Sequence, residues 1–279
     1  MMNLHSETNI RLLAFMAILV IMLVFETLFP RKRRTQDRLK HILNNLGIVL
    51  SYTVLLQIVF RLVPIGAAMG MAAYAQAKGW GVLNLFDMPI WLSVTISVIL
   101  LDMAVYWQHV ASHKIPIIWD FHKMHHADRD LDATSGIRFH PVEILASMFY
   151  KMAVVVLLGP PVLGVFLFEV ILNGAAMFNH ANVKLPLWFD KILRLFIVTP
   201  DFHRVHHSIY RHETDSNYGF NLSIWDRVFG SYIAQPQDGH ENMKLGLPQY
   251  QTDAPTNMLW CLKLPFMKQR KVTINPEKS

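Results

Sequence analysis

The chain of 279 residues is 53% hydrophobic and only 16% charged, whereas soluble domains carry roughly 25% charged residues. This composition favours a membrane protein over a soluble one. The single cysteine, Cys261, excludes an intrachain disulfide framework, so a metal site would have to use His, Asp or Glu. Much of the net charge of +6 lies in short basic runs at 31–34 and 268–271. Such runs suit an anionic membrane surface, and nucleic acid is not an expected partner.

Three apolar segments, at about 11–29, 45–64 and 89–112, predict membrane-spanning helices. Each is long enough to cross a hydrocarbon core of about 30 Å. A signal peptide is not expected, because the strong positive cluster follows the first apolar run and no small-residue cleavage site comes after it. The basic run at 31–34 assigns the end of the first span to the cytoplasmic side.

A fourth apolar stretch, 144–179, is interrupted by Gly-Pro-Pro at 159–161. Each half is marginal as a full span, so the break predicts a helical hairpin that enters the membrane and returns to the cytoplasm. The polar segments 114–142 and 187–279 then form a helical cap on the same side. The sequence therefore predicts one all-α integral membrane domain over residues 1–279, in the inner (plasma) membrane.

The pattern H-x-x-H-H occurs twice, in "FHKMHH" and in "FHRVHH". Positions i, i+3 and i+4 share one face of a helix, so each pattern should direct three imidazoles the same way. "HVASH" adds an i, i+4 pair at the end of the third span. With 14 histidines in the chain, two such patterns have a chance expectation of about a tenth of a per cent. These eight histidines predict a metal site: His109, His113, His122, His125, His126, His203, His206 and His207.

Eight imidazoles exceed what one first-row metal ion can hold, so two ions are expected, and imidazole suits iron, copper, nickel and zinc. No Glu-x-x-His occurs, which separates this chain from the carboxylate-bridged di-iron bundles. Asp102 shares a helical stripe with Tyr106, His109 and His113. A carboxylate within a span is costly, so Asp102 either orients a ligand histidine or binds metal; the alternatives are an interhelical hydrogen bond and a pair with Arg61.

Six segments together resemble the fatty acid hydroxylase superfamily, the sterol desaturase-type membrane di-iron enzymes. They are "DMAVYWQHVASH", "FHKMHH", "RFHPVE", "FNHAN", "TPDFHRVHHS" and "NYGFNLSIWDRVFGS", and they cover about residues 98–232. "RFHPVE" and "NHAN" are most similar to the bacterial sterol-desaturase-like branch, which is also similar to alkylglycerol monooxygenases. The resemblance implies that the eight histidines bind iron, with His180 as a ninth ligand. It also implies that His140, Asn217 and Asp226 join Asp102 around the ligands.

The resemblance further implies O₂-dependent oxidation of an unactivated lipid C–H bond at two irons, giving an alcohol or a double bond. A haem-domain "HPGG" motif is absent, so electrons would come from an external ferredoxin- or cytochrome-like donor. Two other functions stay open. One is a zinc-dependent membrane lipid hydrolase with Glu143 or Glu213 as base, and the other is a non-enzymatic metal transporter or sensor. The substrate also stays open among sterols, fatty acyl chains, ether lipids, sphingoid bases and carotenoids.

Overall fold

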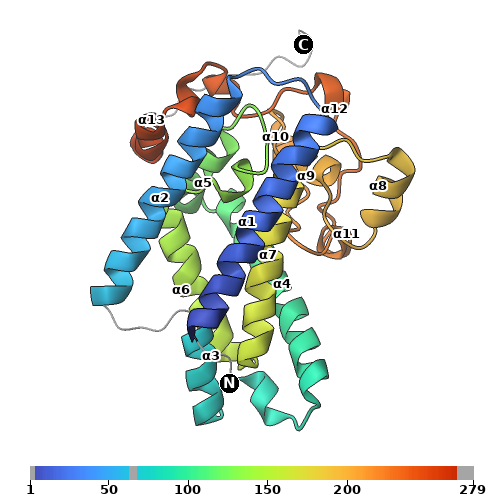
Figure 1. Cartoon of the computed structure of the whole chain (residues 1–279). Helices are drawn as coiled ribbons and strands as arrows, with labels where there is room; N and C mark the ends of the chain where they lie inside the picture. Colours follow the sequence, from blue (N-terminus) through green and yellow to red (C-terminus); the bar gives the residue numbers. More distant parts are fainter. Residues whose placement is uncertain (1–3, 63–67, 269–279) are drawn as a thin grey trace.

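A computed structural model describes residues 4–62 and 68–268, and these residues form helices and short 3₁₀ turns without a β-strand (Figure 1). Residues 63–64 of the second predicted span and 269–271 of the last basic run lie outside the described residues. The long helices are α1 (Leu4–Leu28), α2 (Arg38–Leu62), α4 (Ile90–Lys114), α6 (Pro141–Leu158) and α7 (Val162–His180). All five have the length and apolar composition of membrane spans.

The shorter helices lie toward the end of the bundle at which α1 ends and α2 begins, except α3, which lies at the opposite end (Figure 1). They are α3 (Ala68–Lys78), α5 (Pro116–His126), α8 (Leu187–Leu193), α9 (Pro200–His206), α10 (Arg211–Thr214), α11 (Ile224–Val228), α12 (Gly239–Asn242) and α13 (Met258–Lys263).

The predicted break between α6 and α7 is confirmed. Gly159 ends α6 in the left-handed conformation, with φ +65°, and its backbone N–H bonds to Val155 O. A Cβ atom at this position would lie 2.4 Å from Trp80 O, so both the conformation and the close packing require glycine. Pro161 then precedes the first turn of α7. The two helices run antiparallel on either side of this break (Figure 1), and the return of the segment to the cytoplasmic side stays a prediction.

Helix α7 lies at the centre of the bundle, in contact with α1, α3, α4 and α9. A buried apolar cluster joins α4, α6 and α7 through Leu101, Val105, Met152, Val165 and Phe168. The outer faces are also apolar: Leu13, Leu50, Trp91 and Leu157 are each more than half exposed. Apolar side chains on both faces are typical of helices that have lipid as their solvent, so the chain is an integral membrane protein.

A buried polar network ties the start of α2 to the segment that follows α5. His41 lies between two carboxylates, with Nε2 2.8 Å from Asp128 Oδ1 and Nδ1 3.0 Å from Asp132 Oδ2. Arg34 donates to Asp132 and to Glu26 of α1. Burial raises the pKa of Asp128, but His41 and then Arg138 outweigh it, so the pKa lies below its ordinary value. His41 belongs to no motif, and the sequence did not predict this network.

Candidate metal centre

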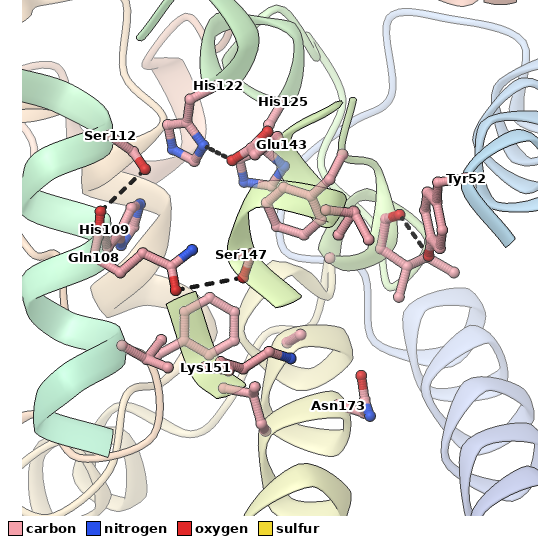
Figure 2. A pocket seen from close by; sticks show the side chains of 18 of the residues that line it. Tyr52, Gln108, His109, Ser112, His122, His125, Glu143, Ser147, Lys151 and Asn173 are labelled. Carbon is pink, nitrogen blue, oxygen red and sulfur yellow. Dashed lines mark hydrogen bonds and ion pairs between the residues drawn. The ribbon is translucent and has the colours of Figure 1, made fainter. Parts of the chain in front are cut away.

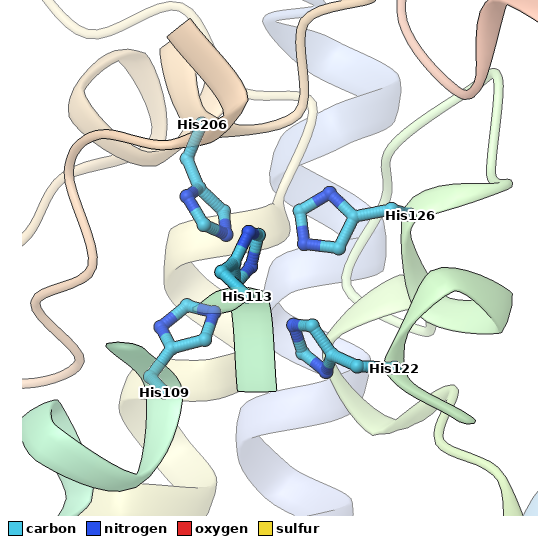
Figure 3. A group of neighbouring side chains, drawn as sticks. All are labelled: His109, His113, His122, His126 and His206. Atoms are coloured by element: carbon cyan, nitrogen blue, oxygen red, sulfur yellow. The ribbon is translucent and has the colours of Figure 1, made fainter. Parts of the chain in front are cut away.

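Nine buried histidines form two adjacent groups where α4, α5, α7 and α9 meet, and Figure 3 shows the first group. The first group contains His109, His113, His122, His126 and His206. The second group contains His125, His180, His203 and His207. Within each group, one ligand atom from every ring lies within 4.8 Å of all the others. The nine residues are the eight pattern histidines together with His180, and their binding of metal stays a prediction.

Each H-x-x-H-H pattern contributes to both groups. On α5, His122 and His126 belong to the first group and His125 to the second. On α9 and its C-cap the order is reversed, since His206 belongs to the first group and His203 and His207 to the second. The expectation that one pattern directs three imidazoles the same way was therefore too simple. The i, i+4 pair stays together, and the third ring points into the neighbouring group because consecutive helical residues are about 100° apart.

Backbone carbonyls fix the orientation of two rings in the first group. His109 Nδ1 lies 2.7 Å from Tyr218 O, and His206 Nδ1 lies 2.7 Å from Ser216 O. A carbonyl oxygen only accepts, so each Nδ1 carries the proton and each Nε2 presents a lone pair. The Nε2 atom of His206 is buried and has no hydrogen-bond partner among the described residues.

A carboxylate orients a third ring of this group. Glu143, in the first turn of α6, places Oε1 2.6 Å from His122 Nδ1. A carboxylate bound to one imidazole nitrogen fixes the ring and makes the other nitrogen a stronger ligand. The Nε2 atom of His122 is likewise buried without a hydrogen-bond partner in the described part of the chain. In this arrangement Glu143 supports a histidine, a role the sequence did not assign to it.

The second group contains a contact that hydrogen bonding does not explain. His180 Nδ1 donates to Ala176 O at 2.7 Å, and His125 Nδ1 donates to Arg138 O at 3.2 Å. Their Nε2 atoms, which must both present lone pairs, are nevertheless 3.1 Å apart. His203 and His207 also bring Nε2 to 3.1 and 3.2 Å from His180 Nε2.

This donor set fits a metal ion. A cation between the converging lone pairs removes their repulsion, and ligand nitrogens about 2.1 Å from a metal lie roughly 3.0–3.4 Å from one another. Metal binding also needs neutral imidazoles. Burial, followed by neighbouring histidines, lowers the pKa well below its ordinary value at five of the nine rings, so they are neutral at neutral pH. These five are His125, His126, His203, His206 and His207.

Asp102 and Asp226 hold the loop that carries the Tyr218 carbonyl. Asp226 accepts from the backbone N–H of Tyr218 and of Gly219, both at 2.7 Å. Burial raises the pKa of Asp226 to about 6 although these bonds lower it. Asp102 accepts from Leu222 N at 3.0 Å, and also from Asn221 N and Trp225 Nε1. Hydrogen bonds therefore link Asp102 to His109 through this loop, and the hydrogen bonds that Asp102 makes among the described residues do not involve Arg61.

Asn217 and His140 have structural partners of their own. Asn217, at φ 49°, donates to Phe202 O and to Ile233 O, which joins α9 to the segment after α11. His140 caps α6, where Nδ1 accepts from Val142 N and Nε2 lies 3.2 Å from Leu262 O. With both ring nitrogens in use, His140 positions the helix that carries Glu143 and is not placed as a ligand.

A cavity of about 150 Å³ adjoins the histidines (Figure 2). Its wall includes His109, His122 and His203, and it extends between the apolar side chains of α4, α6 and α7. The site is therefore reached from a space inside the helix bundle, and an apolar lining of this kind suits a lipid chain.

The chain is similar in sequence to several enzymes named for the oxidation of lipids. Human alkylglycerol monooxygenase is 30% identical over 67% of this chain and 39% of its own length. Ornithine lipid hydroxylase of Rhizobium tropici is 31% identical over 53% of this chain and 44% of its length. Mouse lathosterol oxidase is 28% identical over 51% of this chain and 46% of its length. The chain thus spans less than half the length of these relatives. No solved structure matches it significantly.

The matched family covers the candidate site. Residues 94–231 match the fatty acid hydroxylase family, and this range contains all nine clustered histidines. It also contains Asp102, Glu143 and Asp226. The chain therefore carries a fatty acid hydroxylase domain and belongs to the fatty acid hydroxylase superfamily.

Proposed function

We propose that this protein uses O₂ to oxidise a C–H bond of a membrane lipid at a di-iron centre held by the nine histidines. The product is an alcohol or an alkene. The observation that carries the proposal is the pair of buried all-histidine groups beside a cavity within the helix bundle. The relatives are named as a monooxygenase, a hydroxylase and an oxidase, which supports the same class of reaction.

The ligands divide between two ions in this proposal. The first ion is held by His109, His113, His122, His126 and His206, and the second by His125, His180, His203 and His207. Bound iron supplies the activation of O₂ and the redox chemistry. The chain itself orients rings through carbonyls and Glu143, keeps five of the imidazoles neutral by burial, and limits water at the reacting carbon through its apolar cavity wall.

The electrons come from an external ferredoxin- or cytochrome-like donor at the cytoplasmic face of the inner (plasma) membrane. The basic run Arg31–Arg34 lies at the histidine-bearing end of the bundle, which supports this orientation. A basic surface also attracts an acidic redox partner. The substrate is a sterol, a fatty acyl chain or a related lipid.

Two observations favour this proposal over the rivals. Glu213 does not line the cavity, and Glu143 is bound through Oε1 to the ring of His122, an arrangement that orients a histidine and does not set the carboxylate apart as a base for water. The histidine groups also lie together near one end of the spans, whereas a transporter needs ligands along a pathway across the membrane.

Metal analysis of purified protein combined with lipid profiling tests the proposal. We expect about two irons per chain, and a lipid product that gains one oxygen or loses two hydrogens in an O₂-dependent manner. His125→Ala should lower iron content and abolish the product. His212→Ala is the matched control, because His212 is 61% exposed and lies outside both groups. Tightly held zinc with O₂-independent lipid hydrolysis would refute the assignment.

A further inference from the structure

The cavity contains polar groups that the proposed reaction does not use. Figure 2 shows Gln108 of α4 and Ser147 of α6 below the histidines, with Lys151 one helical turn further along α6. Glu143, Ser147 and Lys151 are spaced four residues apart, so they share one face of α6. Lys151 lies about 12 Å along the helix axis from Glu143, the residue that holds His122.

Two hydrogen-bond donors face this cavity without an acceptor in the described part of the chain. Ser147 Oγ donates to Gln108 Oε1 at 3.3 Å, which leaves the Gln108 amide nitrogen turned toward the cavity. The Lys151 ammonium makes no hydrogen bond or ion pair with any residue that the structure describes, and it points between α6 and α7 (Figure 2). Donors in such a position select a ligand with acceptor atoms.

The charges around Lys151 do not cancel. Glu169 of α7 and Arg11 of α1 are the charged groups that act on it. Glu169 is already paired with Arg11, so the three residues together leave one positive charge within the spans. An ammonium at the centre of a membrane helix is costly unless it has a counter-charge, and such residues commonly mark a substrate site.

We propose that this cavity selects a lipid carrying an anionic oxygen group, a carboxylate or a phosphate, which Lys151 binds with Gln108 as a further donor. The inference rests on the proposed function for the cavity being the substrate site. It places the anionic group about 12 Å along α6 from Glu143, the residue that binds His122. Neutral lipids such as sterols and alkylglycerols should bind in this cavity more weakly than anionic lipids.

Equilibrium binding to purified protein in neutral detergent tests this inference. The probes are palmitate, hexadecyl phosphate and hexadecanol, which share a chain length and differ in charge, with inorganic phosphate as a chain-free anion. We expect wild-type protein to bind the two anionic lipids about 10–100-fold more tightly than hexadecanol. Inorganic phosphate should bind far more weakly, because it lacks the chain; equal affinity for it would mean that the site takes a free anion and would overturn the lipid assignment.

Substitutions test whether Lys151 is the residue that causes the preference for anionic lipids. Lys151→Gln should lose the preference for anionic lipids and leave hexadecanol binding unchanged, whereas Lys151→Arg should keep the preference. Lys78→Gln is the matched control, since it removes the same charge from an exposed position of α3. Equal binding of palmitate and hexadecanol by wild-type protein overturns the inference whether or not a variant folds. The same applies if Lys78→Gln and Lys151→Gln weaken palmitate binding equally.

Failure of this inference is distinguishable from failure of the proposed function. Binding is measured on metal-free and on iron-loaded protein and requires no turnover. A protein that prefers anionic lipids but forms no oxidised product contradicts the proposed function alone. A protein that oxidises a lipid but binds charged and neutral probes equally contradicts the inference alone.

Discussion

Replacing Gly136 with alanine should damage the second histidine group without touching a histidine. Gly136 lies in the 3₁₀ turn Ser135–Ile137, packed on Ala176 of α7. An added Cβ atom would lie 2.2 Å from Ala176 O, whereas ordinary C···O contacts are about 3.3 Å or longer, so the two backbones must separate by about 1 Å. Ala176 O is the acceptor that holds His180 Nδ1.

The displacement acts on both sides of the second group, because the turn that contains Gly136 leads directly to Arg138, whose carbonyl holds His125. Ligand groups must be held to within about 0.5 Å. Loss of such an orienting contact commonly lowers metal affinity about 10–100-fold, and overpacking costs about 1–3 kcal/mol of stability. We therefore expect Gly136→Ala to retain iron at one group and lose it at the other.

Iron content after dialysis against graded chelator, together with thermal unfolding, measures both effects. Gly70→Ala is the control, because a Cβ atom at this helical position meets no atom within 4 Å and should be neutral or stabilising by about 0.5–1 kcal/mol. Wild-type iron affinity and wild-type stability in Gly136→Ala would refute the reasoning that the turn positions the ligands.

The remaining predictions concern the supporting residues and pH. Glu143→Gln should lower iron affinity about 10–100-fold in a chelator competition, whereas Glu241→Gln, at a side chain that is 66% exposed, should not. Asp102→Ala should lower stability by about 1–3 kcal/mol for each buried donor left unpaired, and Asp102→Asn by less, as thermal unfolding would measure. Metal-free protein should lose stability as the pH falls below about 6.5. Below that pH the histidines of the unfolded chain take up protons, whereas the five histidines with lowered pKa values stay neutral in the folded protein. Each of the five therefore lowers the free energy of unfolding by about 1.4 kcal/mol per pH unit. A melting temperature that is constant between pH 7.5 and 5.5 would contradict this.

Local patterns were sufficient to predict much of the architecture. Hydropathy and Gly-Pro-Pro predicted the apolar helices and the break between α6 and α7, because both signals lie within a single stretch of chain. The histidine patterns predicted eight of the nine residues that the fold brings together, because side chains of one type at helical spacing leave a clear signal in the sequence, and the family resemblance added His180.

Only the tertiary structure decided how these parts meet. The acceptors for His109, His125, His180 and His206 are backbone carbonyls, which every residue has and no motif marks. Helical periodicity specifies which rings share a face, but only the fold brings the rings of α5 beside those of α9 and its C-cap and so decides which rings form each group. The surplus charge at Lys151 likewise depends on Arg11 lying against Glu169, far away in the sequence. By itself the sequence determined which ligands are available and which helices carry them; long-range packing decided the grouping, the orientation and the chemistry of the cavity.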